Sequence, residues 1–224
     1  MLPRLLRKVK GIIAISQYTK ERIMSLLSVP EEKIQVIYRT VDDQFSPASA
    51  GDVKRVRNKY NIKWERYVLS LGSLEPKKNL KTLLGGWKRL LPLLKDDVGL
   101  VLAGKQHSRL SLKDLGLDTL PRNVMFTGFV DDEDLPALYS GASVFVFPSL
   151  YEGFGLPPLE AMACGTPVVV SNATSLPEVC GNAALYVNPL DVEDVAEKIE
   201  AVLKDSALAG KMQEKGLAQA AQFS

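Results

Sequence analysis

The stretch that decides the fold runs from Val144 to Glu160 and reads VFVFPSLYEGFGLPPLE. Four consecutive apolar residues, typical of a strand buried on both faces, lead into a loop that contains Gly153 and Gly155. Two prolines follow at the start of a helical segment, where a missing N–H costs no hydrogen bond. The stretch therefore predicts a strand, a glycine loop and a helix, which is one repeating unit of an open α/β sheet.

The same alternation extends along the whole chain in both directions. Short apolar runs predict eight strands, at Ile12–Ser16, Ile34–Tyr38, Tyr67–Leu71, Gly99–Ala103, Val124–Thr127, Val144–Phe147, Val168–Ser171 and Leu185–Val187. Segments with helical period lie between them, at Lys20–Leu27, Asn79–Leu94, Asp132–Ser140, Pro157–Ala163, Val192–Leu203 and Ala207–Ala221. This order predicts an α/β protein with a doubly wound, Rossmann-like, mostly parallel sheet and helices on both faces.

The predicted domain boundary is the segment Thr40–Val53, which contains Pro47 and Gly51 and has little apolar periodicity. The residues before it are too few to bury a core independently. The roughly 170 residues after it are enough for one complete α/β domain. We therefore expect residues 1–45 to be the end of one domain with its connector, and residues 46–224 to be a second, complete domain.

The composition excludes several classes of protein. The 28 basic and 26 acidic residues give a net charge of +2, without the basic excess typical of nucleic-acid binding. Two cysteines cannot form a disulfide framework, and no apolar run is long enough to span a bilayer. The first ten residues, MLPRLLRKVK, are basic and apolar without a cleavage site after them. They fit a helix lying on a membrane surface or an amphipathic helix packed within the protein.

A first candidate site is the turn Gly72–Asn79, which follows the strand Tyr67–Leu71. Ligands of open α/β sheets bind at the carboxyl ends of the strands. Lys77 and Lys78 precede a helix N-terminus, where the helix dipole favours negative charge. An anion bound between these lysines and the helix would resolve that conflict. An ordinary solvated loop is the alternative.

A second candidate site is the loop after Val144–Phe147. Gly153 and Gly155 would let backbone amides face a ligand, and the helix start that follows suits a phosphate. Glu152 and Glu160 lie on either side of that helix start and are good acceptors for sugar hydroxyls. The combination indicates a ligand with both hydroxyls and phosphates. Helix-dipole stabilisation alone would explain Glu160, but not Glu152 beside two glycines.

Other motifs do not support a phosphate loop, a metal site or a dinucleotide-binding site. Gly99–Lys105 has the spacing of a phosphate loop, but Gln106 replaces the Ser or Thr that would bind magnesium. The acidic run Asp131–Asp134 precedes a helical segment, so helix capping is favoured over metal binding. His107 is the sole histidine and has no cysteine cluster near it, which argues against zinc. A dinucleotide-binding glycine fingerprint is missing after every predicted strand.

Several segments together resemble the nucleotide-sugar-dependent glycosyltransferases of the GT-B fold, group 1 or family 4. Glu152 to Glu160 matches the family's E-x7-E signature, and the flanking segments are similar too: Gly128–Val130 with Leu135–Tyr139, Gly165–Val169 and Leu176–Val179. At the front, Ile15-Ser16 with Tyr18-Thr19 resembles the end of the family's N-terminal domain. Val36–Asp42 resembles the interdomain connector, with Arg39-Thr40 where relatives usually have Asn-Gly.

The resemblance implies a division of labour between the two parts. Residues 1–45 would be the tail of the acceptor-side domain with the connector, and residues 46–224 would be the C-terminal, donor-binding domain of a GT-B glycosyltransferase. Closing the cleft between two such domains excludes water and completes the site. We therefore expect the isolated chain to bind a nucleotide sugar but to transfer the sugar weakly or not at all, unless a missing N-terminal domain or a partner chain completes it.

The resemblance also implies roles for single residues. Lys78 would bind the donor diphosphate and stabilise the leaving group, and Glu152 would lie beside the donor sugar; these are the expected catalytic residues. Glu160 would accept the ribose hydroxyls. The donor-binding set is completed by residues that would contact the phosphates, the base and the sugar: Gly72, Ser73, Lys77, Gly104, Val130, Gly153, Phe154, Gly155 and Leu156.

The implied activity is hexosyl transfer from a nucleotide-diphosphate sugar to a glycan or lipid-linked acceptor, with retention of configuration and without a metal or other cofactor. The Leu-Glu-Pro-Lys-Lys-Asn variant of the first turn favours GDP-mannose as donor, with UDP-glucose second. The expected setting is polysaccharide assembly in the cytoplasm, at the inner face of a membrane. Two alternatives remain open: a non-catalytic module that binds a nucleotide sugar or a partner, and a fragment similar to a sugar-nucleotide epimerase.

Overall fold

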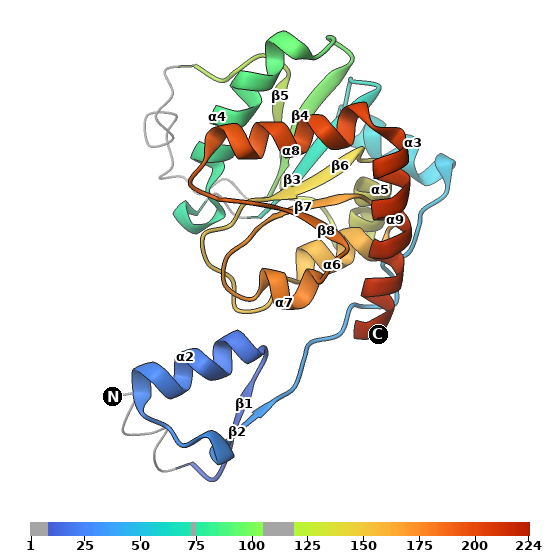
Figure 1. The fold of residues 1–224 in the computed structure, drawn as a ribbon. Coiled ribbons are helices and arrows are strands. Elements are labelled where there is room, and N and C mark those ends of the chain that lie inside the picture. The colour runs from blue at the N-terminus through green and yellow to red at the C-terminus, as the bar shows by residue number, and fades with distance from the viewer. Residues whose placement is uncertain (1–8, 73–74, 105–118) are drawn as a thin grey trace.

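The computed structural model describes residues 9–72, 75–104 and 119–224 and contains one large parallel sheet (Figure 1). Its strand order is β5-β4-β3-β6-β7-β8, and every neighbouring pair is parallel. The strands are β3 (Arg66–Leu71), β4 (Val98–Ala103), β5 (Val124–Gly128), β6 (Val144–Phe147), β7 (Val168–Ser171) and β8 (Ala184–Val187). All six were expected from the sequence as buried apolar runs, and the doubly wound α/β fold is confirmed.

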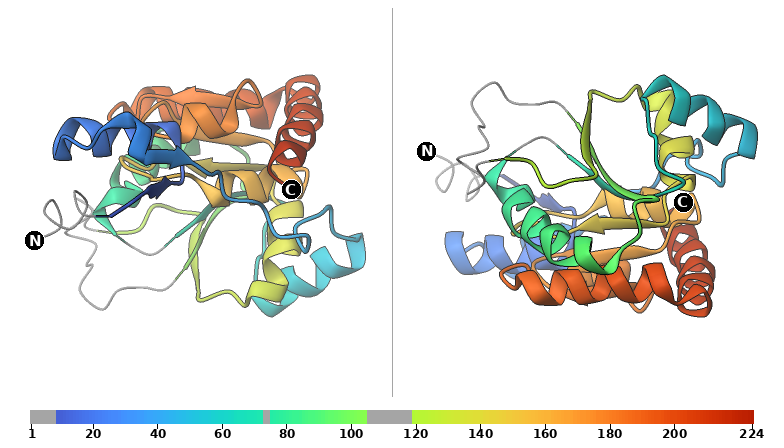
Figure 2. Two further views of the ribbon diagram at one scale, coloured as in Figure 1. Left: turned by 90° about the horizontal axis from the view of Figure 1, so that it is seen from below. Right: turned by 90° about the horizontal axis from the view of Figure 1, so that it is seen from above.

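Helices cover both faces of this sheet (Figure 2). One face carries α4 (Leu80–Leu90) and α8 (Val192–Lys204), which bury Trp87 and Ile199 against Val68, Val144 and Val146. The other face carries α3 (Ala50–Lys59), α5 (Leu135–Ser140), α6 (Leu156–Ala163) and α7 (Leu176–Cys180). The last helix, α9 (Ser206–Ala220), buries Met212 with the first group and Ala220 with the second. Because successive strand residues point to opposite faces, nearly continuous apolar strands supply both cores.

The front of the chain forms a second, smaller unit, coloured blue in Figure 1. Two short parallel strands, β1 (Ile12–Ala14) and β2 (Ile34–Val36), flank α2 (Gln17–Leu27) in sequence. They bury Ala14, Val29 and Ile34 in a cluster separate from the two cores of the large sheet. The connector that follows reaches the end of the chain, where the Val41 N–H donates to the Phe223 carbonyl over 2.7 Å.

Two helices were missed from the sequence. α3 begins inside the segment interpreted as a linker, because Ser49 caps it by accepting a hydrogen bond from the Asp52 N–H. Its charged sequence buries only Val56, so its apolar period is weak. α7 has only five residues, too few to show any period.

The interpretation of the acidic run as helix caps was wrong. Neither the Asp131 side chain nor the Asp134 side chain accepts a capping hydrogen bond from the helical residues that follow it. The Asp134 side chain is instead fully buried and pairs with Arg55 at 2.7 Å and Lys59 at 2.6 Å, both from α3. Burial would raise the pKa of Asp134, but hydrogen bonds from Lys59, Arg55 and Tyr60 lower it below its usual value. The acids therefore hold α3 against the turn before α5.

Within the described residues, none of the helices has the length and apolar character needed to cross a membrane.

Candidate functional site

The candidate site lies where the order of the large sheet reverses. From the central strand β3, the chain continues to β4 and β5 on one side and then returns to β6 on the other. Loops at such a switch point diverge and leave a crevice beyond the carboxyl ends of the strands. Gly72, Gly104, Val130 and Glu152 all follow strands at this edge, after β3, β4, β5 and β6 respectively.

Lys78 and Glu152 meet at the centre of this edge. The Lys78 Nζ lies 2.7 Å from Glu152 Oε1, and each side chain is only 15% exposed. The ammonium group also lies 4.6 Å from the centre of the Phe147 ring. Gly72 gives the lysine room, since a Cβ there would lie 3.1 Å from Lys78 Cε. The two expected catalytic residues thus come together from loops 74 positions apart.

Asn79 fixes the turn that carries Lys78. It is buried, has φ 57° and begins α4. Its side-chain amide donates to the Pro148 carbonyl over 3.0 Å and to the Pro189 carbonyl over 2.6 Å. The Leu150 N–H also donates to the Lys77 carbonyl over 2.8 Å. Asn79 was not among the residues singled out from the sequence, although asparagine tolerates this left-handed conformation better than most residues.

The glycine loop is shaped by two residues that follow β7. The Glu152 N–H donates to Thr174 Oγ1 over 3.1 Å, and Ser175 Oγ donates to the carbonyl groups of Glu152 and Phe154 over 3.0 and 2.7 Å. Gly155 then begins α6 with φ 119°, a conformation that L side chains rarely adopt. Sequence reasoning missed Thr174 and Ser175, because isolated hydroxyl residues in a loop carry no pattern.

Glu160 lies one turn into α6 with a largely buried carboxyl group. The Tyr139 hydroxyl donates to Glu160 Oε2 over 2.9 Å. Burial raises the pKa of Glu160, while the Tyr139 hydrogen bond and the charge of Arg39 act in the opposite direction. Burial and the neighbouring carboxylate hold the pKa of Tyr139 well above its usual value, so its hydroxyl keeps the proton that it donates.

A cleft of about 340 Å³ opens beside Lys78, on the side of β4 and β5. It is lined by apolar and backbone surfaces together with one acidic residue: Leu71, Gly72, Gly104, Phe129, Val130, Asp132 and Leu135. Gly104 and Val130, both expected at the nucleotide base, therefore share one cleft. Val130 is largely buried and reaches the cleft with only a small part of its surface.

The remaining expected residues differ in how the structure places them. Lys77 is half-exposed and pairs with Glu75 at 3.1 Å. Glu75 and, more weakly, Glu152 raise the pKa of Lys77, so this lysine adds positive charge near the site. Ser73 lies outside the described residues, as do the dismissed Gln106 and His107. Among the described residues, no group of three His, Cys, Asp or Glu side chains is placed to hold a metal ion.

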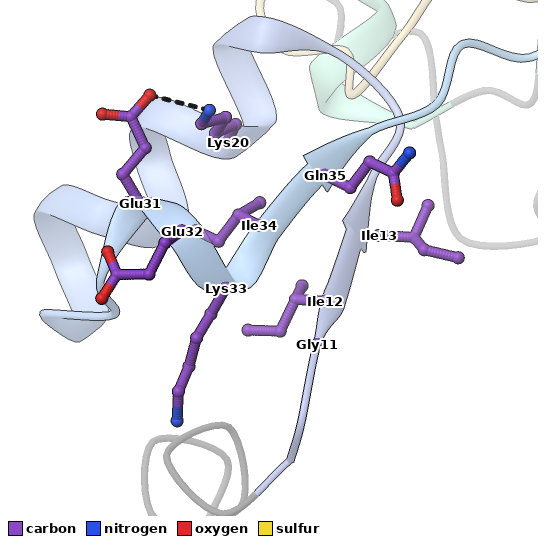
Figure 3. A pocket seen from close by; sticks show the side chains of 9 residues that line it. All are labelled: Gly11, Ile12, Ile13, Lys20, Glu31, Glu32, Lys33, Ile34 and Gln35. Atoms are coloured by element: carbon purple, nitrogen blue, oxygen red, sulfur yellow. Dashed lines mark ion pairs between the residues drawn. The ribbon is translucent and has the colours of Figure 1, made fainter.

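A larger hollow, of about 650 Å³, lies in the front unit (Figure 3). It is open to solvent and lined by β1, β2 and the turn before β2, with the Lys20–Glu31 ion pair at 2.8 Å on its rim. None of the expected site residues lines it. The candidate site is therefore assigned to the edge of the large sheet, where the convergent charged groups are.

Comparisons with known proteins identify the family. Residues 52–219 match the family Glycosyl transferases group 1, and residues 1–45 match Glycosyltransferase Family 4. The chain is 38% identical over 223 residues to the O-antigen chain mannosyltransferase B of Escherichia coli, covering 98% of this chain and 58% of that protein. It is 34% identical over 193 residues to the O-antigen chain mannosyltransferase RfbU of Salmonella typhimurium, covering 85% and 50%.

Solved structures show the same fold. The sucrose-phosphate synthase of Thermosynechococcus elongatus superposes with a TM-score of 0.81 at 26% identity, covering 99% of this chain and 56% of that one. The Anabaena protein HepE, solved in complex with UDP and glucose, gives a TM-score of 0.83 at 22% identity, covering 99% and 62%. The chain thus spans between half and two thirds of the length of these relatives.

Proposed function

The chain belongs to the group 1 glycosyl transferases, and we propose that it binds a nucleoside-diphosphate sugar at the crevice between β3 and β6 and takes part in transferring the sugar. One observation carries the proposal. Lys78 and Glu152 form a 2.7 Å ion pair at the switch point of the sheet, with the start of α6 directly after the same loop. A cation, a carboxylate and a helix N-terminus match the phosphates and hydroxyls of such a donor.

In this proposal, Lys78 binds the diphosphate together with the Leu156 N–H at the start of α6, since Pro157 and Pro158 have no N–H to donate. During transfer, the bond between the anomeric carbon and the diphosphate oxygen breaks, and the diphosphate leaves with the electron pair. An acceptor hydroxyl bonds to that carbon, and its proton passes to an oxygen of the departing diphosphate. Negative charge then grows on the diphosphate, where Lys78, the half-exposed Lys77 and the helix dipole stabilise it. These groups supply the charge that a metal ion supplies in other transferases.

The nucleoside is assigned to the cleft beside Lys78. Gly104 and the Val130 backbone would contact the base, and Glu160 would accept the ribose hydroxyls. The Tyr139 hydrogen bond supports this role, because it fixes one carboxylate oxygen of Glu160 and leaves the other for a ligand. Glu152 and the backbone of Gly153, Phe154 and Gly155 would contact the hydroxyls of the sugar.

We further propose that the sugar is mannose, donated from GDP-mannose to a polysaccharide or lipid-linked acceptor. The support is the identity of 34 to 38% to two proteins named O-antigen chain mannosyltransferases, over most of this chain. Retention of configuration and a setting at the cytoplasmic face of a membrane are further expectations, which the family resemblance implies.

Residues 1–45 are proposed to be part of an acceptor-side domain, with residues 46–224 as the donor side. Their match to Glycosyltransferase Family 4 supports this division. Ile13 and Leu26 are 67% and 65% exposed, so each presents apolar surface that further residues of such a domain would cover.

The test is thermal unfolding of the chain in the presence of GDP, UDP, GDP-mannose and UDP-glucose, in buffer containing EDTA. A ligand at 100 times its dissociation constant adds about 2.7 kcal/mol to the stability, which for this size is a shift of about 5–10 °C. We expect the guanine nucleotides to shift the midpoint and the uracil nucleotides to shift it less. The mannose donor is refuted if only UDP compounds stabilise the chain, and no shift with any nucleotide would refute donor binding by this chain.

A further inference from the structure

The start of α2, in the front unit, is completed by a residue of the large unit. Ser16 caps the helix by accepting the Thr19 N–H over 3.0 Å. The two preceding N–H groups, of Gln17 and Tyr18, donate to the two carboxylate oxygens of Glu178 over 2.6 and 3.0 Å. α2 has no acidic residue in its own first turn, so Glu178 supplies the negative charge that favours a helix N-terminus.

The same helix start also contacts the glycine loop of the candidate site. The hydroxyl groups of Ser16 and Thr19 lie 2.7 and 3.1 Å from the Gly153 carbonyl oxygen. Ser16 is fully buried there. Gly153 is the residue directly after Glu152, so a contact from the front unit reaches the loop that carries the expected sugar-binding groups. None of the sequence motifs indicated this contact.

The geometry of the peptide bond gives the contact a consequence for the site. In a planar trans peptide, the carbonyl of Gly153 and the N–H of Phe154 point in opposite directions. Two hydroxyl groups that hold the carbonyl toward α2 therefore hold the Phe154 N–H away from α2. The same contact limits rotation of the peptide that follows Gly153, and the Glu152 N–H, two peptide units earlier, is held by Thr174.

We propose that Ser16, Thr19 and Glu178 form a clamp between the two units that positions the loop from Glu152 to Gly155 toward the donor sugar. The proposal rests on the proposed function, since it concerns the sugar end of the same donor. These three are positioning residues: Ser16 and Thr19 act through the Gly153 carbonyl, and Glu178 acts by holding the start of α2. The position of the front unit and the conformation of the loop from Glu152 to Gly155 are thereby coupled.

The clamp should change the affinity for the sugar part of the donor without changing the affinity for the nucleotide part. The measured quantity is the ratio of the dissociation constants for GDP-mannose and GDP, obtained by calorimetry with the whole chain. UDP-glucose and UDP replace this pair if they are the nucleotides that stabilise the wild-type chain. The main variant combines Ser16→Gly and Thr19→Val. Glycine is a tolerated N-cap and valine has the shape of threonine, so both hydroxyls are lost with little change to α2.

We expect the double variant to raise this ratio about fivefold to tenfold, the equivalent of one or two neutral hydrogen bonds. The single variant Thr19→Ser keeps both hydroxyl groups and should therefore keep the wild-type ratio. Ser25→Ala is the matched control on α2, because the Ser25 hydroxyl contacts only the Arg22 carbonyl of its own helix among the described contacts. Glu178→Gln serves as an independent variant if the double variant unfolds, and it should move the ratio in the same direction.

Two results would overturn the clamp while leaving the proposed function intact. One is an unchanged ratio in a folded double variant or in Glu178→Gln. The other is an equal loss of affinity for GDP and GDP-mannose, which would assign these contacts to general stability. A wild-type chain that binds neither nucleotide pair would instead refute the proposed function, and with it the role of the clamp.

Discussion

Replacing Lys78 by methionine is the most direct test of the site. Methionine keeps most of the side chain's length and its packing against Gly72 and Phe147, but it removes the charge. In the free protein this charge is paired with Glu152 at 2.7 Å in a mostly buried position. The variant therefore removes one cation from the edge of the sheet and leaves the surrounding surface largely intact.

The expected loss can be worked out from the contact. A hydrogen bond between charged groups contributes about 1.5–3 kcal/mol, which corresponds to roughly a tenfold to hundredfold weaker binding of GDP. The lower half of that range is favoured, because wild-type Lys78 gives up part of its contact with Glu152 when it binds the diphosphate. Glu152→Gln should therefore bind GDP as well as or better than the wild type, since it removes the competing carboxylate.

The assay is calorimetric titration of the chain with GDP at neutral pH and low salt, supported by urea unfolding to show that each variant is folded. Lys77→Met is the matched control, because Lys77 is the adjacent lysine, half-exposed and paired with Glu75. We expect the control to weaken binding by only about twofold to threefold, as is usual for an exposed charge. A dissociation constant for folded Lys78→Met within about twofold of the wild type would refute the assignment of the diphosphate to Lys78.

Three further predictions concern stability and its pH dependence. Burial raises the pKa of Glu160, so the free energy of unfolding of the wild type should fall relative to that of Glu160→Gln as pH rises through this pKa. Urea unfolding of both proteins at several pH values measures this difference, and a difference that does not change with pH would contradict the prediction. Asp134→Asn should lower the free energy of unfolding by about 2 kcal/mol, since Arg55 and Lys59 lose a charged partner. The difference in free energy of unfolding between the wild type and this variant should disappear as pH falls through the lowered pKa of Asp134. Gly155→Ala places a Cβ 2.7 Å from Leu176 Cδ2 at φ 119° and should cost about 1–3 kcal/mol, whereas Gly210→Ala, in α9 with open space around it, should add about 0.5–1 kcal/mol; equal effects in thermal unfolding would contradict the strain argument.

The fold could be predicted because its signals are local. Most strands of the large sheet are mainly apolar runs such as Val144–Phe147, in which burial on both faces leaves no polar interruption. Alternation with helices then restricts the sheet to a parallel, doubly wound arrangement. The helices that escaped prediction had weak local signals: α3 buries one valine among charged residues, and α7 is a single short turn.

From residue spacing alone the site could be predicted only as two separate candidates, which the family resemblance then assigned to one donor site. The sequence places Lys78 after one strand and Glu152 after another, and the motif from Glu152 to Glu160 predicts a ligand with phosphates and hydroxyls. That the two side chains meet at 2.7 Å depends on β3 and β6 being neighbours, which follows from the order of the strands and not from either loop. Asn79, Thr174 and Ser175 were missed for the same reason, since their importance lies in contacts with distant carbonyl and N–H groups.

The amino-acid sequence by itself determined the repeating strands and helices and the two glycine-containing loops, because backbone preference and burial act over a few neighbouring residues. Only the tertiary structure decided which of these groups touch: Lys78 with Glu152, Asp134 with α3, and Glu178 with the start of α2. The physical reason is that a hydrogen bond or ion pair needs two groups within about 3 Å, and residues 70 to 160 positions apart reach that distance only through the packing of the whole chain.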